Sequence, residues 1–418
     1  MNILVVGGGG REHAIVKKIK ENPKVSKIVA LPGNGTLTKE VEIVPILATA
    51  LEEIIAYAKK ETFDFAIVSP DNPLCLGLVD LLEEIGIPTF GPNKAAAAIE
   101  GSKVFSKGLM KKYHIPTASY EVFTDLRHAL EYIDQWTTFP IVIKADGLAY
   151  GKGVIICQTK EEAKENIVLM MEKELFGEAG KQIVVEEFLT GPEVSVLCFT
   201  DGKVIKPMIS SMDYKKAHND NQGPNTGGMG AIAPNPFYTK ELAEVCMEKI
   251  FLPTMQAMRS EGSPFKGCLY FGLMLTKDGP KVIEYNCRFG DPETQCILPL
   301  LQSDLLTLMI ATRNETLAEE KVLFSDQASC CISLCSNGYP GKYETGKPFF
   351  LSKDHKEKKI FYFDCGSTYQ DNQLVTNSGR VANITAVADN LYDASNNAYE
   401  HICGVEFENM YYRNDIGK

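Results

Sequence analysis

The chain has 418 residues, of which 44% are hydrophobic and 23% charged, a composition typical of a folded globular protein. This length is too great for one compact core, so we expect two to four domains. The formal net charge of −11 argues against a nucleic-acid partner, because phosphate backbones are bound by basic patches. No apolar run approaches the roughly 20 residues that span a bilayer, and Met1–Gly7 lacks the features of a secretory signal. We therefore expect a cytoplasmic protein with no membrane partner and with reduced cysteines.

The first part of the chain alternates between strand and helix patterns. We expect strands at Asn2–Val6, Lys27–Leu31, Phe63–Val68 and Pro88–Phe90, and helices at Arg11–Glu21, Leu51–Lys60 and Leu76–Ile85. Strands that alternate with helices predict a doubly wound parallel sheet. We assign this N-terminal α/β domain to residues 1–103.

After Lys103 the pattern becomes one of α and β segments without regular alternation. The expected strands are Ala118–Phe123, Phe139–Lys144, Gly153–Cys157, Gln182–Glu187, Gly267–Thr276 and Pro280–Asn286, and the expected helices are one ending at Tyr113, Asp125–Gln135, Lys160–Lys173 and Lys240–Arg259. Asp201-Gly202 predicts the turn of a hairpin within Glu193–Met208. The polar stretch Asp213–Pro236 predicts a long irregular loop, and loops of this length are usually functional or disordered.

Two further domains follow from this pattern. The second covers residues 104–325 and contains a small lid-like subdomain at about 120–190. The third, residues 326–418, has a β-rich pattern and closes with a helix at Leu391–Ile402. We therefore expect a multidomain protein of mixed α/β and α+β class.

Four glycines between the first strand and the first helix form the motif Gly7–His13. Backbone N–H groups at such a helix N-terminus bind anions, and glycines allow a phosphate to approach closely. A dinucleotide fingerprint would place a glycine at His13 and an acidic residue after the second strand, which ends Leu31-Pro32-Gly33 instead. The motif favours a phosphate ligand and leaves a nicotinamide dinucleotide, or a tight turn without ligand, as alternatives. His13 is a candidate for contact with a substrate.

Two strand ends in the second domain carry charged residues. Lys144 ends an apolar strand and precedes the glycine-rich segment Ala145–Gly153, so an ammonium and flexible backbone can meet phosphates. This is not a Walker loop, because its spacing is absent and a strand follows where a helix is required. The alternative is a glycine-rich hairpin with solvated lysines. Glu186 and Glu187 end another apolar strand, where an exposed strand end is an equally good interpretation.

Glu284, Asn286 and Arg288 are spaced two apart in a strand and therefore share one face. Carboxylate and amide oxygens suit Mg²⁺, which takes few protein ligands and completes its octahedron with phosphates and water. The arginine can bind an anionic substrate in bidentate fashion. Tyr285 and Cys287 are expected to point into the packing behind. The alternative is a solvated sheet face.

Six motifs in order resemble the phosphoribosylamine–glycine ligase (glycinamide ribonucleotide synthetase) family of the ATP-grasp superfamily: Gly7–His13, Leu31–Thr36, Glu100–Lys103, Lys144–Ala149, Gly223–Gly230 and Asn286–Glu293. Asn337–Gly341 and Gly379–Val381 extend the resemblance through the third domain, in the form with a single activity. The resemblance implies central ATP-grasp domains, a small β-rich C-terminal domain and a monomer. It also implies a reaction of ATP, glycine and 5-phosphoribosylamine that gives glycinamide ribonucleotide, ADP and phosphate through a glycyl phosphate. This is a step of de novo purine biosynthesis.

The resemblance also implies roles for individual residues. On the ATP side, the nucleotide-binding residues are Lys103 and Lys144 for the phosphates, Glu186, Glu187 and Leu189 for the adenine, and Glu193 for the ribose. The metal ligands are Glu284 and Asn286, which hold Mg²⁺ or Mn²⁺ in its place. On the substrate side, the residues are Gly8, Gly9, Asn34, Gly35, Asn225, Thr226 and Gly227 around the ribosylamine, with Arg288 and Asp213 for the carboxylate and ammonium of glycine. Lys144 and Arg288 are the catalytic residues, and Leu148–Gly153 is the candidate lid.

Three positions depart from the family pattern. Asp71-Asn72 replaces Glu-Ala at the substrate rim, Tyr150 replaces a small residue, and Cys287 replaces alanine. Because Asp71-Asn72 lies at the substrate rim, this departure leaves the details of ribosylamine recognition open.

Three alternative functions remain. Another ATP-grasp enzyme, such as a biotin-dependent carboxylase, is disfavoured because the substrate-side motifs resemble the ligase family as well as the nucleotide-side motifs do. An NAD-dependent oxidoreductase is disfavoured by the broken fingerprint. A non-catalytic ATP-binding regulator is disfavoured because the metal ligands and phosphate lysines are all present.

Overall fold

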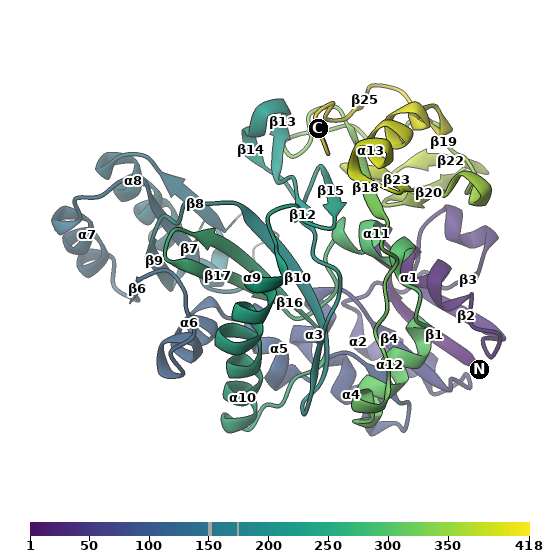
Figure 1. Cartoon of the computed structure of the whole chain (residues 1–418), viewed down its shortest axis with the longest axis horizontal. Coiled ribbons are helices and arrows are strands. Elements are labelled where there is room, and N and C mark those ends of the chain that lie inside the picture. Colours follow the sequence, from purple (N-terminus) through teal and green to yellow (C-terminus); the bar gives the residue numbers. More distant parts are fainter. Residues whose placement is uncertain (149–152, 174) are drawn as a thin grey trace.

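The computed structural model describes residues 1–148, 153–173 and 175–418 (Figure 1). The N-terminal domain contains a parallel sheet with strand order β3-β2-β1-β4-β5. Its strands are β1 (Asn2–Gly7), β2 (Lys27–Pro32), β3 (Glu42–Ile43), β4 (Phe65–Val68) and β5 (Thr89–Phe90), and its helices are α1 (Gly10–Ile19), α2 (Leu51–Ala58), α3 (Asp71–Leu76) and α4 (Leu78–Glu84). The predicted doubly wound parallel sheet is confirmed. The helix predicted at Leu76–Ile85 corresponds to α4, whereas α3 was not predicted. Gly77, which adopts φ +97°, separates the two helices.

The strand order reverses between β1 and β4, and this places the glycine motif. Leu4 and Val6 pack into one hydrophobic core cluster while Ile3 and Val5 pack into another, so both faces of β1 are buried. In such sheets ligands bind beyond the carboxyl ends of the strands, where the order reverses. Gly8 follows β1 at this point, and Asp71 follows β4.

A small subdomain with its own hydrophobic core extends at one end of the molecule (Figure 1). Its antiparallel sheet has the order β6-β9-β7-β8. The elements are β6 (Tyr120–Phe123), β7 (Ile141–Ala145), β8 (Val154–Cys157), β9 (Ile183–Glu187), α7 (Leu126–Gln135) and α8 (Lys160–Met171). Asp125 and Thr159 cap the two helices by accepting backbone hydrogen bonds.

The second sheet of the middle segment has the order β11-β10-β16-β17. It comprises β10 (Glu193–Asp201), β11 (Ile205–Pro207), β16 (Lys266–Thr276) and β17 (Gly279–Asn286), accompanied by α5 (Lys94–Gly101), α6 (Lys103–Lys112), α9 (Lys240–Cys246), α10 (Leu252–Ser260) and α12 (Leu305–Asn314). The predicted hairpin at Asp201-Gly202 is confirmed. The helix predicted over Lys240–Arg259 contains a π-helical turn at Met247–Phe251. The sequence did not reveal α12, because its buried residues cover a wide arc of the helix and leave only a weak amphipathic period.

The C-terminal sheet has the order β12-β15-β18-β23-β20, with β25 beside β18. Its elements are β18 (Ala328–Ser336), β20 (Ile360–Asp364), β23 (Arg380–Ala388), β25 (Met410–Tyr411) and α13 (Leu391–Glu400), with the smaller pairs β19 (Phe349–Leu351) and β24 (Val405–Phe407), and β21 (Ser367–Gln370) and β22 (Gln373–Thr376). Short helices occur at α11 (Glu293–Ile297) and at Thr36–Lys39, Gly177–Gly180, Asn219–Asn221, Leu298–Leu300, Leu317–Glu319, Lys356–Lys358 and Ile402–Gly404.

The prediction of an irregular loop over Asp213–Pro236 is wrong. The segment contains β13 (Lys216–His218), β14 (Gln222–Asn225) and β15 (Gly230–Ala233), and β12 (Met212–Asp213) precedes them. β15 pairs with β18, a strand about a hundred residues later in the chain, which no local pattern can reveal. The C-terminal sheet therefore includes strands on both sides of residue 326, and the domain limits remain a prediction. No helix in the described ranges is both long and apolar enough to cross a bilayer.

The N-terminal domain packs closely on the C-terminal segment at the start of α1. A Cβ atom at Gly10 would lie 2.5 Å from Sγ of Cys365 and 2.5 Å from Nε2 of Gln295. We expect Gly10→Ala to lower the melting temperature, since overpacking costs roughly 1–3 kcal/mol. The control is Gly108→Ala, because Gly108 lies in α6 and a Cβ atom added there would meet nothing within 4 Å. It should keep or raise the melting temperature. Thermal unfolding followed by circular dichroism measures both, and equal melting temperatures would show that the contact at Gly10 yields without cost.

Candidate active site

Two lysines from different elements meet one buried glutamate. Lys144 at the end of β7 and Lys107 on α6 each form an ion pair with one carboxylate oxygen of Glu186 on β9. All three side chains are buried. Burial raises the pKa of Glu186, but the charges of Lys144 and Lys107 outweigh it and the pKa is lowered. Burial lowers the pKa of Lys107 to about 8. The glutamate is thus a fixed anion that orients the Lys144 ammonium.

Lys144 also joins the two sheets of the middle segment. Its Nζ donates a hydrogen bond to the Ile283 carbonyl of β17 at 3.1 Å. Lys103, at the start of α6, donates to the Gly147 carbonyl at 2.7 Å. Ser102 donates through Oγ to the Asp146 carboxylate at 3.1 Å, which fastens the beginning of the glycine-rich segment to α6. The centre of the predicted lid, with Tyr150, lies outside the described residues.

Glu284 and Asn286 lie in β17 and Arg288 follows its end by two residues, and all three are partly exposed. Tyr285 and Cys287 between them are buried in a hydrophobic core cluster, as the alternation predicts. Burial raises the pKa of Glu284, but the charges of Lys215, Lys144 and Lys103 outweigh this effect and the pKa is lowered. The Lys215 Nζ lies 3.7 Å from Oε1 of Glu284. The strand therefore presents an anionic carboxylate among cations.

Arg288 is anchored by its neighbours, but within the described ranges its Nε donor has no partner. Its Nη2 lies 3.0 Å from Oε1 of Glu100, 4.0 Å from Oδ2 of Asp71 and 3.4 Å from Oδ1 of Asn286. Nε of Arg288 is buried and has no hydrogen-bond partner among the described residues. A buried donor without an acceptor is costly, so this atom suits an anionic ligand.

Glu284 and Asn286 are the residues that fit a magnesium ion. Their donor set is one carboxylate and one amide oxygen, the hard ligands that Mg²⁺ prefers. The part of the chain that the structure describes contains no group of three or more His, Cys, Asp or Glu side chains arranged for a metal. This arrangement suits a metal that shares its coordination with substrate phosphates and does not suit a metal enclosed by protein.

The residues expected around the nucleotide base and ribose lie at the junction of β9 and β10. The Glu187 carboxylate accepts hydrogen bonds from the Ser119 N–H at 3.0 Å and from Lys281 at 3.1 Å. Leu189 is half-buried beyond it. Glu193, at the start of β10, lies 2.8 Å from Lys215.

The glycine motif has free backbone donors at the end of β1. The Gly9 N–H donates to Oε2 of Glu12 at 2.7 Å, whereas no hydrogen bond with another described residue engages the N–H groups of Gly8 and Gly10. A Cβ at Gly8 would overlap the Gly33 carbonyl oxygen, so this position requires glycine. Asn34 uses its side chain within the protein, because Nδ2 donates to the carbonyls of Gly8 and Asp364, both at 3.1 Å. The neighbouring Gly35 donates through its N–H to the Ser367 carbonyl at 3.0 Å.

Opposite the glycine motif lies a second wall of the site, formed by Gly227, Asp291, Tyr339 and Arg380. Nη1 of Arg380 donates to the carbonyls of Gly227 at 2.7 Å and Asp291 at 2.8 Å, and Nη2 lies 3.1 Å from the Asp291 carboxylate. Tyr339 Oη accepts from the Gly227 N–H at 2.9 Å. A Cβ at Gly9 would lie 3.7 Å from Oδ2 of Asp291, which shows how close the two walls are.

The predicted residues of the 213–230 segment lie behind and beside this wall. Thr226 donates through N and Oγ1 to the Lys215 carbonyl, both at 2.8 Å, and Asn225 is exposed in β14. Oδ1 of Asp213 is buried without a hydrogen-bond partner among the described residues. Burial and the nearby Glu293 raise the pKa of Asp213 well above its usual value, although Lys215 and Arg380 oppose this. A cation placed here would compensate the carboxylate.

Sequence reasoning missed several residues that the structure places in the site. Glu100, Asp291 and Arg380 lie inside motifs that the sequence analysis identified, but no role was assigned to these three residues. Lys107 and Lys215 carried no signal, because single lysines in helices and polar loops are usually solvated.

Family models for phosphoribosylglycinamide synthetase match the chain in three parts: the N domain at residues 1–100, the ATP-grasp domain at 101–294 and the C domain at 329–418. A phosphoribosylamine–glycine ligase of Caldanaerobacter subterraneus subsp. tengcongensis is 46% identical over 100% of this chain and 99% of that protein. One from Vibrio vulnificus is 44% identical over 100% of this chain and 98% of its own length.

Solved structures agree with these sequence matches. The crystal structure of the Thermotoga maritima phosphoribosylamine–glycine ligase has a TM-score of 0.87 and 32% identity, and the match covers 99% of this chain and 100% of that chain. A biotin carboxylase domain from Hydrogenobacter thermophilus has a TM-score of 0.74 at 16% identity over 98% of this chain and 91% of its own, which shows a shared fold alone. The chain therefore belongs to the phosphoribosylglycinamide synthetase family.

Proposed function

We propose that this ligase joins glycine to 5-phosphoribosylamine with consumption of ATP, through a glycyl phosphate, at the site described above. The observation that carries the proposal is the convergence of three sets of groups at one site. They are the lysines Lys103 and Lys144, the exposed face at the end of β17 with the nearby Arg288, and the glycine motif at the end of β1. Each suits one substrate of the ligation that the names of the family and its relatives describe. This ligation would be a step of purine biosynthesis.

ATP would bind between the small subdomain and β17. Lys103 and Lys144 would contact its phosphates, the backbone at Glu186–Leu189 would read the adenine edge, and Glu193 would bind the ribose. The ion pair between Lys144 and Glu186 supports this assignment, because it holds the ammonium in place before the nucleotide arrives.

Glu284 and Asn286 would hold Mg²⁺ or Mn²⁺. A metal ion bound there supplies neutralisation of the phosphate charge. The cations around Glu284 keep its carboxylate ionised and so ready to bind.

The chemistry would proceed in two displacements. The glycine carboxylate attacks the γ-phosphorus, ADP leaves, and glycyl phosphate forms; the ribosylamine nitrogen then attacks its carbonyl carbon and phosphate leaves. Nε of Arg288 would bind the glycine carboxylate and Asp213 its ammonium, which compensates that buried acid. The free N–H groups of Gly8 and Gly10 would bind the phosphate of the ribosylamine. Both nucleophiles belong to substrates, so the protein contributes orientation, charge and exclusion of water.

ADP release measured with Mg²⁺, ATP, glycine and freshly made 5-phosphoribosylamine, with each omitted in turn, tests the proposal. We expect ADP only when all four are present. ADP formed without the ribosylamine, or no ADP from any mixture, would contradict the assigned substrates.

A cytoplasmic monomer completes the proposal. All twelve cysteines lie within the described residues and none forms a disulfide bond, which suits a reducing compartment. Sedimentation equilibrium measures the oligomeric state directly.

A further inference from the structure

We infer that His13, Asp364 and Asn34 form a relay through which the C-terminal domain positions the glycine motif for the phosphate of 5-phosphoribosylamine. The relay rests on the proposed function, since it concerns the affinity for one of its substrates. His13 and Asp364 are positioning residues in it and do not touch the substrate.

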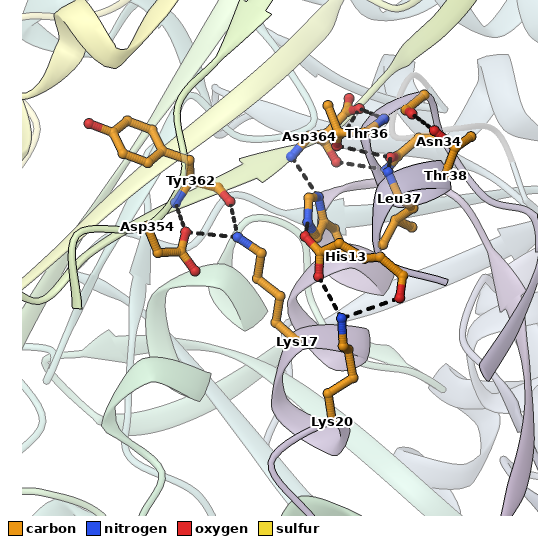
Figure 2. Close-up of polar contacts among 12 residues, drawn as sticks. His13, Lys17, Lys20, Asn34, Thr36, Leu37, Thr38, Asp354, Tyr362 and Asp364 are labelled. Carbon is orange, nitrogen blue, oxygen red and sulfur yellow. Dashed lines mark hydrogen bonds and ion pairs between the residues drawn. The ribbon is translucent and has the colours of Figure 1, made fainter. Parts of the chain in front are cut away.

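His13 lies on α1 and points toward the C-terminal domain, not toward the substrate as its place in the motif suggested (Figure 2). The side chain is 1% exposed. Nδ1 accepts a hydrogen bond from the Asp364 N–H at 2.9 Å, and Nε2 lies 3.3 Å from Oε1 of Glu40. Burial raises the pKa of Glu40, but His13, Lys17 and Lys20 outweigh it and lower the pKa to about 2. Glu40 is therefore an acceptor, so Nε2 of His13 carries the proton and Nδ1 serves Asp364.

The Asp364 peptide passes this contact on to Asn34. The Asp364 carbonyl accepts a hydrogen bond from Nδ2 of Asn34 at 3.1 Å (Figure 2). The same amide group donates to the Gly8 carbonyl at 3.1 Å. Oδ1 of Asn34 accepts from the Leu37 N–H at 3.0 Å, which leaves only one orientation for the amide. A single amide thus connects the C-terminal domain to the glycine motif.

The Asp364 carboxylate holds the loop that carries Asn34. Oδ2 accepts from the N–H of Thr36 at 3.0 Å and from its hydroxyl at 2.9 Å, and Oδ1 accepts from the Gly366 N–H at 3.0 Å. A further bond comes from the Ser367 hydroxyl. Asp364 is fully buried, and its hydrogen bonds satisfy the buried charge. The residue is a rigid connection between the domains.

The carbonyls of Gly7, Gly8 and Gly9 all accept hydrogen bonds within the protein, and these bonds set the direction of the free N–H donors. The Gly7 carbonyl accepts from the Gly33 N–H at 3.2 Å, and the Gly9 carbonyl accepts from the His13 N–H at 3.0 Å. In a trans peptide the N–H points away from the carbonyl of the same plane. The N–H groups of Gly8 and Gly10 are therefore directed away from these contacts, where a phosphate can approach. The relay holds the Gly8 carbonyl, which belongs to the peptide between these two planes, so loss of the relay would release that peptide and shift the donors on either side of it.

Two substitutions at His13 separate the relay from simple packing. His13→Leu removes the acceptor for the Asp364 N–H, whereas Oδ1 in His13→Asn can occupy the position of Nδ1 and preserve it. A third variant, Asn34→Asp, keeps the shape of the side chain but places an oxygen against the Gly8 and Asp364 carbonyls. We expect His13→Leu and Asn34→Asp to raise KM for 5-phosphoribosylamine about tenfold or more, because a buried polar contact is lost. KM for ATP and for glycine should change less than about twofold, and His13→Asn should restore most of the affinity.

Titration calorimetry with ribose 5-phosphate, a stable phosphorylated probe, measures the same effect without turnover. Wild-type protein that neither binds this probe nor turns over 5-phosphoribosylamine would overturn the proposed function. Wild-type protein that does both, with His13→Leu and Asn34→Asp unchanged, would overturn the relay alone. A uniform loss of kcat with equal shifts in all three KM values would also overturn it, because that pattern indicates a general structural role. If His13→Leu fails to fold, the KM values of Asn34→Asp and His13→Asn decide by the same criteria.

Discussion

Replacement of Lys144 by alanine is expected to lower turnover by about 100-fold or more, the usual effect of removing one group that stabilises charge in a transition state. The ammonium has three donors. Within the described residues one is directed at Glu186 and one at the Ile283 carbonyl, so the third remains for a phosphate oxygen. Because the group is fixed before the reaction, its loss should lower kcat more than it raises KM for ATP.

Steady-state assays of ADP release measure this effect. The matched control is Lys164→Ala, since Lys164 lies on α8 of the same subdomain and, among the described residues, pairs with Asp134 alone at the surface. It should retain normal turnover. Turnover of Lys144→Ala within about threefold of wild type would remove this residue from the phosphate site.

Replacement of Glu284 by alanine is expected to raise the Mg²⁺ concentration for half-maximal activity roughly tenfold or more, because loss of even an outer-shell partner costs 10- to 100-fold. The carboxylate lies among Lys215, Lys144 and Lys103, which lower its pKa and keep it charged. Asn286 alone would then face the metal. Since the effect acts on the metal, excess Mg²⁺ should recover part of the activity.

A titration of activity against free Mg²⁺ at fixed ATP tests this prediction. Glu261→Gln serves as the control, because Glu261 is a carboxylate at the protein surface that pairs with Lys112 and Tyr113. Its titration should match that of wild type. An unchanged titration for Glu284→Ala would exclude Glu284 from the metal site.

Local patterns predicted those parts of the fold that depend on local periodicity. The alternation in β17 identified the face of Glu284 and Asn286, because side chains in a strand repeat every two residues. The dipeptide Asp201-Gly202 likewise predicted the turn of the hairpin. β15 was missed, since its hydrogen bonds are made to β18 far along the chain. The helix α12 was missed because its buried residues cover a wide arc of its surface.

The same division applies to the candidate site. The types and spacing of the residues in the motifs predicted phosphate, metal and substrate groups, but their partners come from distant elements. Glu100 and Asp71 reach Arg288 from α5 and α3. Arg380 reaches Gly227 from the C-terminal sheet. Such contacts could not be deduced from one sequence, because they depend on how whole domains pack.

The sequence by itself determined the family, the parallel N-terminal sheet and the chemical groups available to the site. These follow from residue identity and from periods of two and 3.6 residues, which act over short distances. Only the tertiary structure decided which groups are charged, which donors are free and where His13 points. Burial and contacts between distant segments control these properties, and for His13 the deciding partner is the Asp364 peptide on another domain.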